Sequence, residues 1–72
     1  MTVMKFAVAV AHLKPPELSL HIIACDDWRD ACNTSPAIHW HIPEDMTYLD
    51  MQNHAIEVHS CMVAAVPIFP RS

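Results

Sequence analysis

Residues Val3 to Leu13, VMKFAVAVAHL, alternate between large and small side chains. One face would carry the large apolar residues Met4, Phe6, Val8 and Val10, and the other would carry Lys5, Ala7, Ala9 and Ala11. A period of two over this length predicts a β-strand. We expect the large face to point into the core. The alanine row lets another layer approach closely, either a helix or a second copy of the chain.

A second strand is predicted directly after the first. The segment Lys14–Glu17 contains two prolines and ends the first alternation, and Leu18 to Cys25 then alternates again. Two alternating runs joined by a short proline-containing connection are typical of an antiparallel hairpin. The chain contains no glycine, so this turn is not of a glycine type.

The middle of the chain predicts a short helix and a third strand. Asp26 is a suitable helix N-cap, and Trp28 and Cys32 would share one helix face four residues apart. Asn33–Pro36 has the composition of a loop. Residues Ile38–Ile42 alternate once more, which predicts a strand with its two histidines pointing outward.

The last third predicts a second short helix and a final strand. Pro43, followed by two acidic residues, suits a first helical turn, with Met46 and Leu49 as the buried face. The alternative is a hairpin from Thr47 to Val58. A last strand would begin near Ile56 and continue to Val66, and the apolar tail 67–72 would be extended.

This order of elements predicts one α+β domain covering residues 1–72. We expect a mainly antiparallel sheet of about four strands with one or two short helices. A chain of 72 residues forms only a marginal core by itself. Hydrophobic residues make up 53% of the chain and charged residues 17%, so some apolar side chains should remain on the surface as a contact patch. We therefore expect a larger protein partner or a homodimer.

Composition also argues against several classes of function. The longest apolar run is too short for a membrane helix, and the absence of glycine removes the usual phosphate-binding loops. The four basic residues form no stripe, so direct binding to nucleic acid is not expected. The first 13 residues imitate a signal peptide, but their alternation favours a strand. Three cysteines cannot all pair within the chain, which favours reduced thiols and a cytoplasmic location.

One set of residues predicts a possible metal site. His39 and His41, and likewise His59 and Cys61, are spaced two apart on predicted strands, so each pair would share one face. If the two strands are neighbours, three imidazoles and one thiolate could hold Zn²⁺. The alternative is that these are ordinary polar residues of an outer face, since the usual CxxC signature of structural zinc is missing.

Catalysis is not expected. Cys25 and Cys32 lack the CxxC spacing that lowers a thiol pKa, and both are interpreted as packing residues beside Trp28. With three cysteines and six histidines in a short chain, Cys-His pairs arise by chance.

Acidic residues are concentrated in the middle of the chain. The residues predicted to bind a partner are these six acids and two apolar residues of the tail: Asp26, Asp27, Asp30, Glu44, Asp45, Asp50, Ile68 and Phe69. The simpler interpretation is two acidic helix starts facing water. The functional one is attraction to a partner with a basic surface. The sequence thus predicts a non-enzymatic interaction module, an inhibitor or regulator, with a small zinc-stabilised protein as the alternative.

Overall fold

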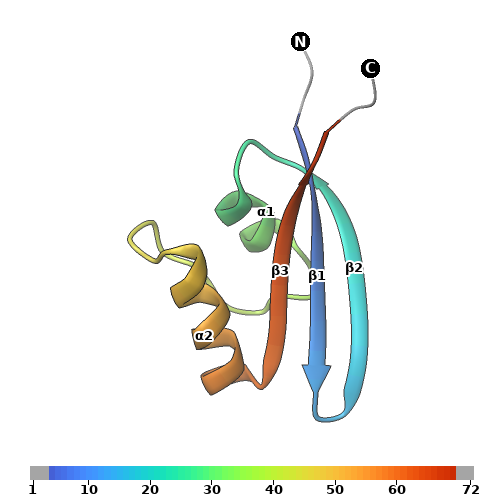
Figure 1. Ribbon diagram of the computed structural model, residues 1–72, viewed down its shortest axis with the longest axis vertical. Helices are drawn as coiled ribbons and strands as arrows, with labels where there is room; N and C mark the ends of the chain where they lie inside the picture. The colour runs from blue at the N-terminus through green and yellow to red at the C-terminus, as the bar shows by residue number, and fades with distance from the viewer. Residues whose placement is uncertain (1–3, 70–72) are drawn as a thin grey trace.

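The computed structural model describes residues 4–69, which form a three-stranded antiparallel sheet and two helices (Figure 1). The elements in chain order are β1 (Lys5–Leu13), β2 (Pro16–Ala24), α1 (Trp28–Thr34), α2 (Tyr48–His59) and β3 (Cys61–Ile68). The strands lie in the order β2-β1-β3. The α+β class is therefore confirmed, but the described residues contain three strands where the sequence predicted about four.

The predicted hairpin is confirmed. β1 and β2 pair antiparallel from Lys5 opposite Ala24 to Leu13 opposite Pro16. The turn consists of Lys14 and Pro15, joined by a cis peptide bond. Because β1 is the central strand, its even-numbered residues pack into the core and its odd-numbered residues face away from the helices.

Helix α1 follows β2 after a short bend. Its N-cap is Asp27, whose carboxylate accepts a hydrogen bond from the Asp30 amide at 2.8 Å. The predicted cap at Asp26 was wrong by one residue, since a side-chain oxygen caps the amide three positions later. Cys32 is fully buried and Trp28 partly buried, so this helix presents the face that the sequence predicted.

The predicted strand at residues 38–42 was wrong. Ile38 and Ile42 are buried while the histidines between them are exposed, so burial alternates as expected without a strand backbone. The reason lies in Asn33 of α1, whose amide side chain bonds both the N–H and the C=O of Ile42, at 2.8 and 3.1 Å. Backbone groups that a strand would offer to a neighbour are thus bound by a helix side chain.

Helix α2 begins later than the predicted second helix, and it occupies segments for which the sequence predicted a hairpin or a strand. Pro43 begins a turn rather than a helix, and the N-cap is Thr47, which accepts a hydrogen bond from the Asp50 amide at 3.1 Å. The alternative hairpin from Thr47 to Val58 was wrong, and so was the strand start at Ile56, because both segments belong to this helix.

The buried face of α2 also differs from the prediction. It consists of Met51 and Ala55, four residues apart, whereas Leu49 is 65% exposed and Met46 lies before the helix. Residues spaced by four share one side of a helix, which places this pair against the sheet.

Ser60 joins α2 to β3 in a left-handed conformation with φ of 51°. Strand β3 then pairs antiparallel with β1, with Lys5 opposite Ile68. The predicted extended tail therefore begins later than expected, because Pro67 and Ile68 belong to β3. Residues 70–72 of that tail lie outside the described residues.

The core lies between the sheet and one layer of helices. Phe6, Val8 and Val10 of β1 are at most 6% exposed, and they pack with Met51 and Ala55 of α2. Met4, predicted to join them, is 38% exposed. Both helices lie on the same side of the sheet, to the left of the strands in Figure 1, where α1 contacts all three strands and α2 packs mainly beside β3. No helix within residues 4–69 is long and apolar enough to cross a membrane.

Candidate functional site

The face of the sheet that the helices do not cover is almost entirely apolar, and we call it the open face. Strand pairing aligns its residues in rows: Leu18, Ala11 and Met62; then Leu20, Ala9 and Ala64; then Ile22, Ala7 and Val66; then Ala24, Lys5 and Ile68. Lys5 is the one charged side chain in these rows. An antiparallel sheet that faces water normally carries polar residues on its outer face. This sheet therefore has two apolar faces and one covering layer.

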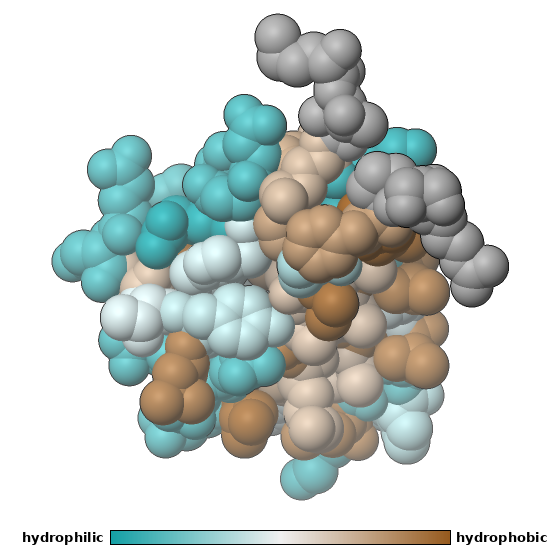
Figure 2. Space-filling model, turned by 45° about the horizontal axis from the view of Figure 1, so that its top comes forward, coloured by the Kyte–Doolittle hydropathy of each residue, from teal (hydrophilic) through white to brown (hydrophobic). Residues whose placement is uncertain are grey.

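Large apolar side chains of the open face are strongly exposed. Leu18 is 75% exposed, Leu20 63% and Ile22 56% on β2, and Met62 and Val66 are each 55% exposed on β3. Figure 2 shows apolar side chains gathered toward one side of the molecule and hydrophilic ones toward the other. In small proteins generally, a contiguous apolar area of this kind is typical of a surface that contacts another molecule.

The open face has a raised–low–raised profile. The central strand β1 contributes only alanines at its middle, while the flanking strands contribute leucine, isoleucine, methionine and valine, except for Ala64 of β3 beside Ala9. A depression of about 270 Å³ lies at the low part, lined by Ala9, Ala11, Leu18, Met62 and Ala64 together with Gln52 and Val63. We call this low strip, which runs along the alanines of β1, the alanine trough.

The outer edge of β3 is covered by α2. The hydroxyl group of Tyr48 accepts a hydrogen bond from the Ala65 amide at 2.8 Å and lies 3.3 Å from the Ala65 carbonyl oxygen, to which it donates. Gln52 donates to the carbonyl of Val63 at 3.0 Å. Pro67, the next residue of this edge, has no N–H to offer. These groups protect the edge from pairing with another strand.

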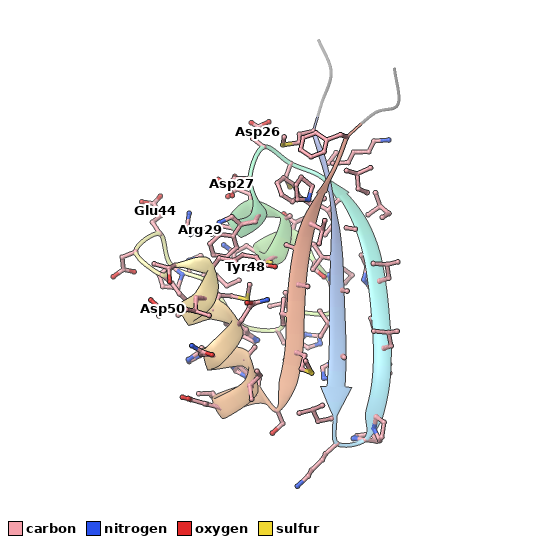
Figure 3. All side chains as sticks on the ribbon, in the orientation of Figure 1. Asp26, Asp27, Arg29, Glu44, Tyr48 and Asp50 are labelled. Atoms are coloured by element: carbon pink, nitrogen blue, oxygen red, sulfur yellow. The ribbon has the colours of Figure 1, made fainter. Side chains whose placement is uncertain are left out.

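The six acidic residues of the middle segment all lie exposed in the helix layer and its connections. Figure 3 shows Asp26 and Asp27 at the start of α1, and Glu44 and Asp50 near α2. A shallow depression of about 660 Å³ beside α2 is lined by Asp45, Asp50, Glu57 and His54, among others. The acidic residues and the open face thus occupy different surfaces.

Arg29 binds the turn at residues 43–46, which contains two of the acidic residues. Its Nε donates to the Pro43 carbonyl at 3.1 Å and its Nη2 to the Met46 carbonyl at 2.8 Å. Its guanidinium group also lies 4.7 Å from the ring centroid of Trp28, a cation–π contact. In Figure 3, Arg29 lies between the two helices, where it ties the turn before α2 to α1.

The residues predicted to hold zinc are not arranged as predicted. His39 and His41 lie exposed in the loop before α2, His59 ends α2, and Cys61 begins β3 buried in the core. The predicted strand at residues 38–42 is absent from residues 4–69, and His59 belongs to α2 rather than to the strand that contains Cys61. Within these residues, no three histidine, cysteine or acidic side chains form a group that could hold a metal ion.

His59 instead belongs to an aromatic cluster. Its ring stacks on Trp40 with the centroids 4.6 Å apart and the planes 7° apart, and His54 lies 5.0 Å from the same tryptophan. The Nε2 atom of His59 is buried without a hydrogen-bond partner among the described atoms. The cluster packs the loop that contains Trp40 against the end of α2.

The three thiols are free, and two of them are buried. Burial raises the pKa of Cys32 to about 11 and also raises the pKa of Cys61. Both thiols are therefore protonated at neutral pH, which is unfavourable for nucleophilic attack and for metal binding as thiolates. This agrees with the interpretation of Cys32 as a packing residue.

The two apolar residues predicted to bind a partner differ in position. Ile68 lies at the end of the open face and is 39% exposed. Phe69 follows β3 and is 70% exposed. The sequence reasoning did not identify Tyr48, Gln52 or Arg29. The only signal for any of them was that Arg29 is the single basic residue in an acidic segment.

The comparisons with known proteins give no relationship: no family model, no curated protein and no solved structure matches this chain.

Proposed function

We propose that this protein is a non-enzymatic interaction module that binds an amphipathic helix of a larger protein on its open face. The observation that supports the proposal is the apolar surface formed by all three strands, in which Lys5 is the one charged residue. Such a module would act as an inhibitor or regulator, because it would cover a helix that its partner uses elsewhere.

The dimensions of the alanine trough favour a helix as the ligand. Strands two apart in a sheet are separated by about 10 Å, which is close to the diameter of a helix with its side chains. Nine-residue strands such as β1 extend about 30 Å, the length of a helix of about 20 residues. A docked helix would supply the layer that this fold lacks.

The acidic surface has a different proposed role. Because the six acidic residues lie in the helix layer, they do not form part of the docking contact. We propose that they attract a partner whose docked helix is flanked by basic groups. Charges on separate surfaces act at long range and are screened over about 8 Å at physiological salt. Added salt should therefore slow association more than it changes dissociation.

A cytoplasmic location is part of the same proposal. Cys25, Cys32 and Cys61 are all free, and disulfides are rare where thiols are kept reduced.

Site-specific photo-crosslinking in cells tests the proposal. A photoreactive amino acid at Ala9, in the centre of the alanine trough, should crosslink to an amphipathic helix of a larger protein. The same group at Asn53, exposed on α2, is the matched control and should not. Substitution Ala9→Leu should fill the trough and reduce the yield of a crosslink from Ala7 at least tenfold, with an unchanged circular dichroism spectrum. Equal crosslinking from Asn53, or a partner segment that is not helical, would contradict the proposal.

A further inference from the structure

The free edge of the sheet lies on β2, and the direction of its backbone groups follows from two hydrogen bonds. In an antiparallel sheet, the N–H and C=O of one residue point to the same side, and the side alternates along the strand. The Cys25 amide donates to the Met4 carbonyl at 3.0 Å, so the odd-numbered residues of β2 face β1. Leu18, Leu20 and Ile22 therefore direct their N–H and C=O groups away from the sheet.

A second hydrogen bond confirms this alternation. The Leu13 amide donates to the Ser60 carbonyl at 3.0 Å, so the odd-numbered residues of β1 face β3 and its even-numbered residues face β2. In the register of the hairpin, the even residues Val8 and Val10 lie opposite His21 and Ser19. The two observations agree on which side of β2 is free.

The two edge strands, β3 and β2, differ in whether side chains bind their outward backbone groups. On β3, Tyr48 and Gln52 bind the outward groups of Ala65 and Val63. On β2, no side chain among residues 4–69 bonds to the outward groups of Leu18, Leu20 or Ile22. Proteins usually block long apolar edges with charge, proline, bulges or a covering element. In this sheet, α2 covers the edge of β3, and the edge of β2 can pair with another strand.

We propose that β2 pairs antiparallel with β2 of a second copy of this chain, about a two-fold axis at Leu20. The pairing joins two three-stranded sheets into one continuous sheet. Leu20 lies opposite Leu20 of the second copy, and Leu18 lies opposite Ile22. Each outward N–H and C=O of these three residues then finds a backbone partner, as isologous pairing requires.

The side chains and charges of β2 fit a second copy. On the open face the cross-strand neighbours are all leucine and isoleucine, which favours pairing. On the opposite face, Ser19 meets His21. With His21 counted as neutral, Glu17 is the only charged residue of β2, and the two-fold axis places the two Glu17 residues at opposite ends, about 20 Å apart. No like charges oppose each other along the interface.

The dimer does not depend on the proposed helix binding. Edge pairing uses the backbone of β2, and it leaves the open faces of both copies side by side and uncovered. Loss of dimerisation and loss of partner binding can therefore be observed separately.

Sedimentation velocity of the purified full chain is the first test. We expect a dimer of twice 8.1 kDa for the unmodified protein. Leu20→Lys places two ammonium groups opposite each other at the axis and should give a monomer. Val66→Lys is the matched control: it makes the same change at a residue of similar exposure on β3, and it should remain a dimer. Circular dichroism verifies that each variant is folded.

Disulfide trapping tests the register. In a Cys25→Ser background, Leu20→Cys should crosslink to itself under mild oxidation, because directly opposed hydrogen-bonded residues have Cα atoms about 5.5 Å apart, within disulfide range. Leu18→Cys should not, since the same residue of the second copy lies about four positions away along the strand. Amide exchange adds a third measurement: the amides of Leu18, Leu20 and Ile22 should be as protected as those of Ser19 and His21.

Three results would overturn the proposal. The first is an unmodified protein that stays monomeric at all concentrations up to about 1 mM. The second is a dimer that Val66→Lys dissociates and Leu20→Lys leaves intact, which would place the second copy on the open face. The third is equal crosslinking of Leu18→Cys and Leu20→Cys.

Discussion

Ser60 is the one residue among residues 4–69 with a positive φ, which is 51°. The chain has no glycine anywhere, so a serine occupies the left-handed position that ends α2. We predict that Ser60→Gly stabilises the protein by about 1 kcal/mol, because glycine adopts this conformation without a Cβ clash.

Thermal unfolding measures this effect. For a domain of this size, the substitution should raise the melting temperature by about 4–8 °C. Ser60→Ala is the control, since it removes the hydroxyl group but keeps the Cβ, and it should not raise the melting temperature. A similar gain from both variants would mean that relief of backbone strain is not the cause.

The buried thiol of Cys32 makes the free energy of unfolding depend on pH in the alkaline range. Burial disfavours the thiolate and raises the pKa of Cys32 from its ordinary value of 9.0 to about 11 in the folded protein. The folded state binds this proton more tightly, so its stabilising contribution is complete below pH 9 and is lost as the pH rises from 9 to 11. We predict that the free energy of unfolding falls across this range, by roughly 2–3 kcal/mol at most.

Urea denaturation at several pH values checks this dependence, with Cys32→Ala as the reference. That variant is destabilised by its lost packing, but its stability should fall less steeply between pH 9 and 11. Equal slopes for the two proteins would show that other groups cause the alkaline loss. The raised pKa of Cys61 acts in the same direction and should remain in both.

At the scale of elements, Tyr48 connects α2 to the edge of β3. Its hydroxyl group bonds both backbone groups of Ala65, and its ring meets Trp28 edge to face at 5.0 Å. Tyr48→Phe keeps the ring and removes the hydroxyl group, so we expect a loss of about 1–3 kcal/mol from unsatisfied backbone groups.

The same substitution should expose the β3 edge to pairing with other molecules. We expect Tyr48→Phe to increase light scattering on heating relative to Leu49→Ala, a change at an exposed neighbour on the same helix that should alter stability by less than about 0.5 kcal/mol. If both variants aggregate alike, the hydroxyl group does not protect the edge.

The hairpin and the first helix could be predicted from the sequence, because their signals are local. Alternation over β1 and β2 and a capping aspartate depend only on neighbouring residues. The segment around Trp40 could not be predicted in the same way. Its burial alternates as in a strand, but its backbone pairs with the Asn33 side chain, a contact between segments nine positions apart. The alternation of apolar residues in a sequence indicates which side chains are buried. It does not indicate which groups form hydrogen bonds with the backbone.

The second helix illustrates a conflict between propensity and packing. Ile56 and Val58 favour strands, and both are exposed on α2. Met51 and Ala55 make the contacts that hold this helix on the sheet, and two buried residues four apart are a weak pattern in a sequence. The error at this element removed the strand pair on which the zinc prediction depended.

The whole molecule has a single core shared by the sheet and both helices. We predict that it unfolds in one cooperative transition, with tryptophan fluorescence and far-ultraviolet circular dichroism coinciding at every protein concentration. Trp28 and Trp40 both lie in the helix layer, so fluorescence follows that layer while circular dichroism follows the entire fold. Fluorescence that changes at a lower temperature would show that the helices detach before the sheet unfolds.

The open face could be predicted only in part from the sequence. The alanine row of β1 indicated that another layer could approach, and the apolar composition indicated a contact surface. The sequence did not show that Leu18, Leu20 and Ile22 share this face with Met62 and Val66, because that depends on the strand order β2-β1-β3. Strand order is decided by contacts between the two ends of the chain, which no local pattern reports.

The pairing of β1 with β3 also has a consequence for biosynthesis. Lys5 lies opposite Ile68, so β1 has no second neighbour until residues 61–68 have been translated. Until then, the nascent hairpin exposes the free edge of β1 and apolar residues on both of its faces. Ribosome-bound chains that end before residue 61 should therefore bind chaperones that recognise exposed hydrophobic segments more strongly than the completed domain does.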